Sequence, residues 1–92
     1  MTVRAKFKVQ RIEASQTMKA VGKNEQGATR HEVCELHTIV LQPVYSNDPE
    51  HENAKFWAAS PSGEIKLGTI NPEAWQAFEL GGEYYIDFTK AE

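Results

Sequence analysis

The sequence predicts an all-β fold with one short helix, built as a single small domain. Its 92 residues are 40% hydrophobic and 25% charged, which is typical of one soluble globular domain. Apolar and polar residues alternate in several short segments, as strands with one buried face require. A single helix-start signal is present, and it comes late in the chain.

The first strand is expected over residues 3–12. Apolar residues occupy every second position from Val3 to Val9, and the residues between them are basic, so the strand has one buried face and one basic face. The alternation slips at Ile12. We therefore expect a β-bulge there, or a strand that turns a barrel corner.

A long polar loop, or a flexible hairpin tip, is expected over residues 13–31, because this stretch contains Gly22 and Gly27 and shows no sustained period. A loop of this length is uncommon in a compact domain unless it has a function, such as forming one wall of a binding groove. The most β-prone segment follows at residues 31–45. A second loop, acidic in this case, is expected over residues 46–54.

The second half of the chain predicts a tight hairpin over residues 56–67, followed by a short helix. Asn71 and Pro72 mark the helix start, since Asn is a good N-cap and Pro suits the first helical position. Gly81 and Gly82 are expected to stop the helix.

Trp75 and Phe78 lie three residues apart on one face of this helix, so we expect them to pack in the core. A closing strand is expected over residues 83–88. The order of elements is that of a small SH3-like five-stranded barrel. An OB-like barrel is the alternative, although its helix falls between the third and fourth strands.

No catalytic or cofactor-binding motif is present, because the sequence lacks a glycine-rich phosphate loop and zinc-type cysteine pairs. We therefore expect no enzyme, no cofactor and no metal site. Cys34 is the single cysteine, which excludes an intrachain disulfide and favours a reducing cytosol, and we expect it in the core. No apolar run approaches the roughly 20 residues of a membrane helix, so no membrane contact is expected.

Charge is distributed unevenly along the chain, although the formal total is only -3. Residues 1–30 contain seven Lys or Arg and two Glu, whereas residues 31–92 contain three Lys and eleven acidic residues. Such an asymmetry can steer a charged partner, but the acidic total argues against a surface that binds nucleic acid throughout. Nucleic acid is expected to bind only through a local basic stripe.

Candidate binding residues fall into three groups. The first is a basic stripe on the outer face of the first strand, suited to phosphate groups: Arg4, Lys6, Lys8 and Arg11. The second is a set of outward aromatic rings that stack on bases or anchor a protein interface: Tyr45, Trp57 and Tyr85. The third is acidic and suited to a basic partner: Asp48, Glu50 and Glu52. An ordinary solvated surface, or for the rings a cover over the barrel end, is the alternative.

Several local motifs occur together in one order: Val44 and Tyr45, Glu52-Asn53 with Phe56, the Pro61-Ser62-Gly63 turn, Asn71-Pro72 with Phe78, and the ending Gly82-Glu83-Tyr84-Tyr85-Ile86-Asp87-Phe88-Thr89. With them, residues 44–89 resemble small uncharacterised proteins of tailed bacteriophages, and the basic first strand is similar as well. Lys90 departs from the likeness, because the family often has a proline there. The resemblance implies a viral origin and brings no activity with it.

We expect a non-enzymatic module that binds a viral or host protein, or a second copy of itself. The small size, the two polar loops of opposite charge and the lack of a catalytic motif favour this class. With the viral origin that the resemblance implies, we expect a virion accessory protein, or an inhibitor of a host enzyme or defence system, located in the host cytoplasm or in the particle. A single-stranded nucleic-acid-binding protein that uses the basic stripe is the first alternative. A symmetric oligomer that sequesters a small anionic signal molecule, with Arg4, Lys6 or Arg11 at its phosphates, is the second.

Overall fold

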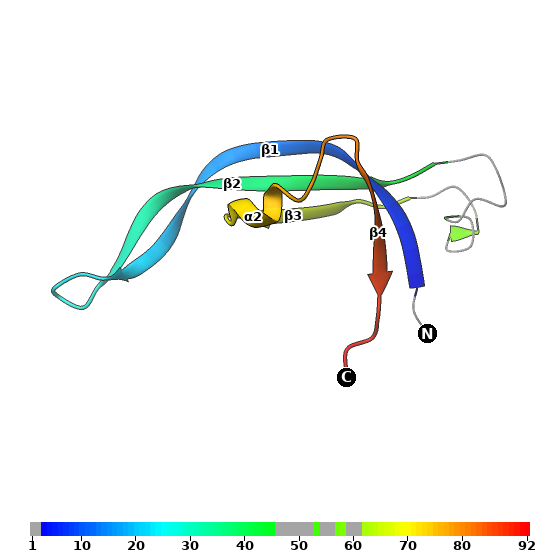
Figure 1. Ribbon diagram of the computed structural model, residues 1–92. Helices are drawn as coiled ribbons and strands as arrows, with labels where there is room; N and C mark the ends of the chain where they lie inside the picture. The colour runs from blue at the N-terminus through cyan, green and yellow to red at the C-terminus, as the bar shows by residue number, and fades with distance from the viewer. Residues whose placement is uncertain (1–2, 46–52, 54–56, 59–61) are drawn as a thin grey trace.

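The computed structural model describes residues 3–45, 53, 57–58 and 62–92. They form one antiparallel sheet of four strands in the order β3-β2-β1-β4, with one short helix beside it (Figure 1). The elements are β1 (Val3–Lys23), β2 (Thr29–Pro43), β3 (Ile65–Thr69), α2 (Pro72–Trp75) and β4 (Glu83–Phe88). The predicted all-β class with one short helix is confirmed.

The five-stranded barrel, SH3-like or OB-like, is not confirmed, because the described residues form an open sheet. Of the hairpin predicted over residues 56–67, the described residues include only the second strand, β3, which pairs with residues 37–41 of β2. Trp57 is helical, since its backbone N–H donates over 3.1 Å to the carbonyl oxygen of Asn53, four residues earlier. Ala58 follows with a positive φ of 56°, which is the left-handed helical region and is incompatible with a β-strand at this residue.

β1 and β2 form one long hairpin. The prediction of a long loop over residues 13–31 is therefore wrong, and the alternative, a hairpin tip, applies only to residues 24–28. Only residues 24–28 form the turn, where Asn24 Oδ1 accepts from the backbone N–H groups of Gln26 (3.0 Å) and Ala28 (2.9 Å). We call residues 13–36 the β-ribbon, because they extend the hairpin beyond β3 and β4 (Figure 1).

A β-bulge interrupts β1 next to the position where the alternation slips. Val9 lies opposite Leu41 and Arg11 lies opposite Val40, so Gln10 is the extra residue. The bulge restores the core-facing direction at Ile12, which follows it by two residues. The predicted irregularity at the end of the first alternating segment is therefore confirmed.

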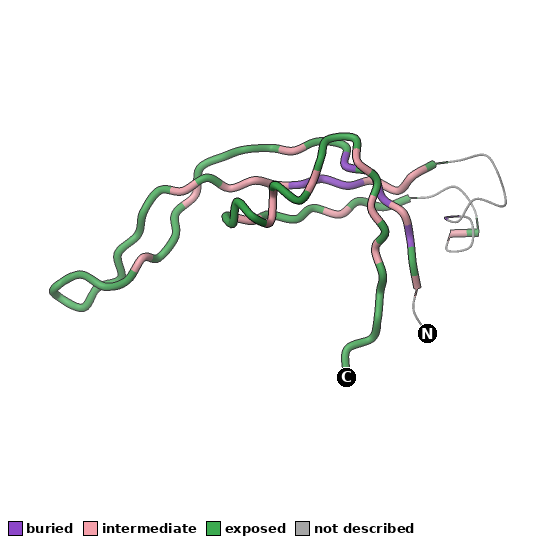
Figure 2. Tube along the Cα trace, viewed as in Figure 1, coloured by how far each residue is buried: buried purple, intermediate pink, exposed green. Residues whose placement is uncertain are grey.

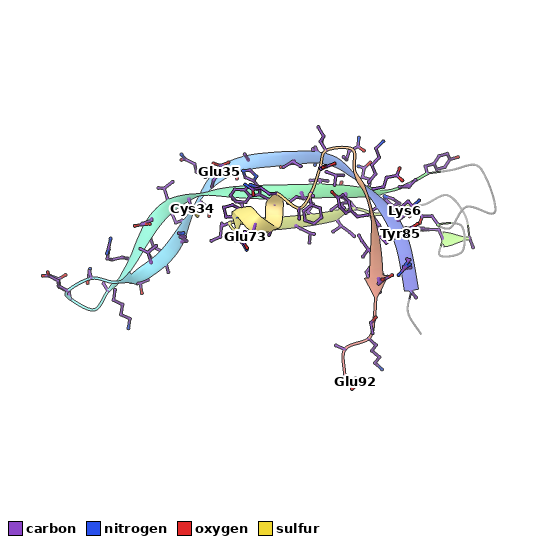
Figure 3. The ribbon with its side chains drawn as sticks, in the orientation of Figure 1. Lys6, Cys34, Glu35, Glu73, Tyr85 and Glu92 are labelled. Carbon is purple, nitrogen blue, oxygen red and sulfur yellow. The ribbon has the colours of Figure 1, made fainter. Side chains whose placement is uncertain are left out.

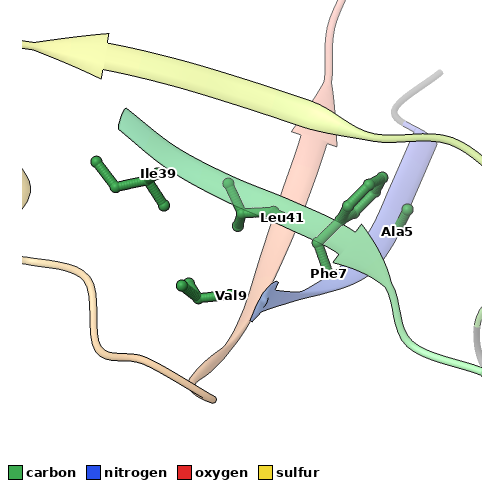
Figure 4. Close-up of a cluster of buried hydrophobic side chains, with 5 residues drawn as sticks. All are labelled: Ala5, Phe7, Val9, Ile39 and Leu41. Carbon is green, nitrogen blue, oxygen red and sulfur yellow. The ribbon is translucent and has the colours of Figure 1, made fainter. Parts of the chain in front are cut away.

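The core lies on one face of the sheet, where β1, β2 and β4 overlap. Five buried apolar side chains from β1 and β2 form its centre (Figure 4): Ala5, Phe7, Val9, Ile39 and Leu41. Trp75 and Phe78 pack against this cluster, which confirms their predicted role. Tyr84 and Ile86 of β4 complete the packing.

α2 begins as the sequence predicts and ends earlier. The Asn71 side chain accepts a hydrogen bond from the Glu73 N–H over 3.1 Å, and Pro72 occupies the first helical turn. The helix ends at Trp75, before the two glycines that were expected to stop it.

Those two glycines join the end of the helical segment to β1. The Val9 N–H donates to the Gly82 carbonyl oxygen over 2.9 Å, and the Gly81 N–H donates to the Val9 carbonyl oxygen over 3.0 Å. Tyr84 fixes the same segment from β4, since its hydroxyl accepts from the Glu79 N–H over 2.8 Å. The connection thus extends the pairing of β1 beyond β4.

The molecule is elongated, with extents of 62 × 33 × 19 Å and a Cα radius of gyration of 18.1 Å. A compact chain of this length has a radius of gyration of about 12 Å. The β-ribbon makes the difference, because it projects from one end of the core and is exposed along most of its length (Figure 2). Among the described residues, no helix is long and apolar enough to cross a membrane.

Candidate functional site

The predicted basic stripe lies on the face of β1 that is opposite to the core, next to β4. Arg4 forms a two-pronged ion pair with Asp87, at 2.6 and 3.0 Å. Lys6 Nζ lies 3.8 Å from a carboxylate oxygen of Glu83. The Arg4 Cζ and the Lys6 Nζ lie 5.1 and 5.3 Å from the centroid of the Tyr85 ring. Lys6 and Tyr85 are opposite each other on β1 and β4 (Figure 3).

The rest of the stripe is also matched by carboxylates. Arg11 Nε donates to Glu13 over 2.7 Å, and Lys8 lies opposite Glu83 in the β1–β4 register. The Arg11 hydrogen bond lowers the pKa of Glu13, and Glu13 in turn raises the pKa of Arg11. Acidic groups therefore alternate with the cations, and the face does not present a continuous track for phosphates.

The predicted aromatic group is divided between different surfaces. Tyr85 is 54% exposed and lies with the basic stripe, and Tyr45 is 62% exposed just after β2. Trp57 is half-buried, since its ring packs on Phe7 with centroids 6.0 Å apart and its Nε1 donates to the Ser62 carbonyl oxygen over 2.9 Å. Its role as an anchor for a partner stays a prediction.

The predicted acidic residues Asp48, Glu50 and Glu52 lie outside the described residues. Their neighbour Asn53 is described and is 1% exposed. Its Oδ1 accepts from the Lys6 N–H over 2.7 Å, and its Nδ2 donates to the carbonyl oxygens of Lys6 (2.8 Å) and Val44 (2.9 Å). The Asn53 side-chain amide thus bonds both the N–H and the carbonyl oxygen of Lys6, as a neighbouring strand would, at the point where β2 ends. These bonds hold the backbone of Lys6 in place.

Cys34 does not lie in the core as expected. It is half-buried on the β-ribbon, directly opposite Thr17, and it is a free thiol. His37 lies on the same strand, three residues after Cys34, and opposite Ala14. Because side chains alternate along a strand, His37 and Cys34 point to opposite faces of the sheet. In the part of the chain that the structure describes, no three metal-ligating side chains gather.

The β-ribbon carries an exposed apolar pair that the sequence analysis did not single out as a site. Met18 and Val33 lie directly opposite each other and are 54% and 61% exposed. Val33 shares the parity of Ile39 and Leu41 on β2, so the pair extends the core face of the sheet onto the ribbon. The pair becomes visible in the sequence only after residues 13–31 are interpreted as a hairpin.

The β-ribbon also has open edges. β4 pairs with residues 3–8 of β1, and β3 pairs with residues 37–41 of β2. Beyond those ranges, no further strand in the described part of the chain pairs with either edge. An unpaired edge offers backbone donors and acceptors to another chain.

Comparisons with known protein families, with curated proteins and with solved structures find no match. The function therefore has to be argued from the surfaces of this chain. The likeness to phage proteins stays an expectation from the sequence.

Proposed function

We propose that the chain is a non-enzymatic binding module that acts through protein–protein contacts made by its β-ribbon. One observation carries the proposal: the accessible surface is 6915 Å² for a chain of 10.4 kDa. A compact monomer of that mass has about 5,400 Å². The surplus of about 1,500 Å² exceeds the roughly 800 Å² that each partner buries in a standard interface.

The structure of the β-ribbon supports a bound state. A two-stranded hairpin on its own is only marginally stable in water, because it has no second layer to cover its faces. This ribbon also exposes Met18 and Val33 side by side, and it leaves both edges unpaired within the described chain. Contact with a partner would cover the apolar pair and satisfy the edge groups together.

The resemblance to phage proteins suggests where such a module works. We propose a virion accessory protein, or an inhibitor of a host factor or defence system, acting in the host cytoplasm. Both roles need a contact surface and no catalytic group.

Single-stranded nucleic acid is the second candidate ligand, because Tyr85 is exposed between Arg4 and Lys6. The ion pairs to Asp87 and Glu83 weaken this candidate, since a phosphate would have to compete with them. Fluorescence anisotropy with labelled single-stranded DNA at two salt concentrations tests it. Binding that falls steeply with salt, and that is lost on replacing Lys6 and Lys8 by Glu, would favour nucleic acid over protein.

The proposal itself is tested by placing a charge on the apolar pair. Val33→Lys should weaken protein binding by about tenfold or more, whether the partner is another protein or a second copy, because a buried ammonium needs a partner. Gln26→Lys adds the same charge in the exposed ribbon turn and serves as the control. Light scattering reports self-association, and capture on the immobilised protein reports other partners. Binding that is equal in both variants, or absent from the wild type, would reject the proposal.

A further inference from the structure

We infer that the partner of the β-ribbon is a second copy of this chain, an inference that rests on the proposed function and makes it specific. Residues 29–36 form the open stretch of β2, and we propose that they pair antiparallel with the same stretch of the copy. A two-fold axis perpendicular to the sheet would pass midway between the two copies of Val33, which would lie directly opposite each other. The result is one four-stranded sheet made of two ribbons.

The edge of β2 is better suited to this pairing than the edge of β1. The β1–β2 register shifts twice, between Val9 and Arg11 and between Ala20 and Lys23. In both cases the extra residues lie on β1, so its open edge is interrupted at both ends, whereas β2 runs without a bulge. Bulges protect an edge from pairing with other chains, and a regular edge lacks that protection.

The sequence of the edge selects the position of the axis. Residues directly opposite each other in an antiparallel pair point to the same face, so in a two-fold pair of identical strands one residue must lie opposite its own copy, with the axis between the two. The middle of the open stretch of residues 29–36 offers Glu32 or Val33. An axis at Glu32 would place two carboxylates directly opposite each other, which is destabilising. An axis at Val33 places two apolar side chains there.

The axis at Val33 also pairs every neighbouring residue without a conflict of charge. His31 comes to lie opposite the partner's Glu35, and by symmetry this contact occurs twice. Glu35 already contacts His37 through Oε1, which leaves Oε2 to accept a hydrogen bond from the partner's His31. On the other face, Glu32 lies opposite the partner's Cys34. The imidazole and carboxylate pairs thus fix the same register that the apolar contact selects.

The same register builds a continuous apolar row across the joined sheet. Met18 lies opposite Val33 within each chain, so the order across the four strands is Met18, Val33, the partner's Val33 and the partner's Met18. In the single chain, Met18 is 54% and Val33 is 61% exposed. In the dimer, the Met18–Val33 pairs of the two chains would lie side by side at the centre of the contact. Burial of this row and the new ladder of backbone hydrogen bonds both favour the dimer.

Disulfide trapping tests the register directly. In a Cys34→Ser background, Val33→Cys places two thiols across the axis, where opposite Cα atoms lie about 4.5–5.5 Å apart, within the range of a disulfide. His31→Cys in the same background is the control, because its two copies would be offset by four residues, or roughly 13 Å along the strands. Mild oxidation should yield a covalent dimer from Val33→Cys and none from His31→Cys. Equal yields from the two variants would overturn the register.

A charge exchange tests the paired contacts in solution without a crosslink. Glu35→Lys and His31→Glu should each raise the dimer dissociation constant by about tenfold, because each removes two contacts per dimer. The double variant H31E/E35K should return the dissociation constant to within about threefold of the wild type, since the opposite charges face each other again. Thermal melting of each variant separates a folding defect from a dimer defect. A double variant as weak as either single variant would contradict the inference.

The solution mass separates this inference from the broader proposal. Light scattering should give twice the 10.4 kDa of one chain, with a dependence on Val33. A monomer at every concentration, with no trapped dimer, would overturn the self-pairing. If such a monomer still bound another protein through Val33, the proposed function would stand without its self-association.

Discussion

The ion pair between Arg4 and Asp87 joins residues 83 positions apart in the sequence. The hydrogen bond from Arg4 holds the pKa of the Asp87 carboxyl below its usual value. Because the pKa is lower in the folded than in the unfolded chain, the pair stabilises the fold at pH values above the unfolded pKa. This contribution is lost as the pH falls through the folded pKa.

Removing the guanidinium should reverse this shift. In Arg4→Gln, the pKa of Asp87 is expected to rise toward its ordinary value, as measured by a carboxyl-carbon NMR titration. Arg11→Gln is the matched control, because it should raise the pKa of Glu13 and leave Asp87 unchanged. An Asp87 titration that is identical in wild type and Arg4→Gln would show that the pair does not form in solution.

The sequence is informative about individual residues where local patterns decide their environment. Trp75 and Phe78 were correctly assigned to the core from their helical spacing, because the capped helix positions Trp75 and the Phe78 N–H then donates to the Trp75 carbonyl oxygen, which keeps the two residues one turn apart. Trp57 was assigned outward from strand parity, but the residue is helical, so strand parity did not apply to it. Asn53 acts as a strand partner through its side chain, a role that depends on distant Lys6 and leaves no local signal.

At the scale of elements, the turn before β4 depends on a glycine for reasons of space. A Cβ added at Gly82 would lie 3.0 Å from the Glu79 carbonyl oxygen and 3.0 Å from the ring of Tyr84. Because backbone cannot move away as easily as a flexible side chain, Gly82→Ala should lower the free energy of unfolding by about 1–3 kcal/mol. Urea denaturation measures this loss.

Gly68→Ala on β3 provides the control for that variant. The nearest side-chain atom to an added Cβ there belongs to Leu36 at 3.5 Å, which is ordinary van der Waals contact. We expect Gly68→Ala to leave the stability unchanged or slightly higher, since alanine restricts the unfolded chain more than glycine does. Equal losses in the two variants would argue that crowding at Gly82 is not the cause.

The β-ribbon shows why one element escaped prediction. Strands are recognised by alternation when one face is buried, and residues 13–31 are exposed on nearly every position. Here the two strands are held together by the backbone hydrogen bonds of their own pairing, with Met18 opposite Val33. This pairing needs no buried hydrophobic face and therefore leaves no alternating pattern in the sequence. The bulge at Gln10 was anticipated because it lies where the core face does alternate.

At the scale of the whole molecule, stability and binding reside in different parts of the chain. All the buried apolar residues described lie outside residues 16–35. Replacing that segment by Asn-Gly, between the directly opposed Ser15 and Leu36, should therefore keep cooperative thermal unfolding and abolish partner binding. The radius of gyration from X-ray scattering should fall from the 18.1 Å Cα value toward about 11 Å. Loss of cooperative unfolding would show that the ribbon also supports the core.

The fold class was predictable because its signals are local: apolar and polar residues alternate in the strand segments, and Asn71-Pro72 marks the start of the helix. Closure of the sheet was not, because it depends on whether residues near Trp57 form a strand. The elongated shape was unpredictable for the same reason as the ribbon, since it follows from long-range pairing of polar segments.

The pairing of β1 with β4 places Val3 opposite Phe88, and this has a consequence for synthesis on the ribosome. At about 5–20 residues per second, roughly 4 to 17 s separate the addition of these two residues. Throughout that interval, the outer edge of β1 has no β4 to pair with, because β4 has not yet been translated. Termination of translation before Glu83 would release a chain whose β1 has no β4 to pair with, so the codons for residues 83–88 decide whether the sheet is completed.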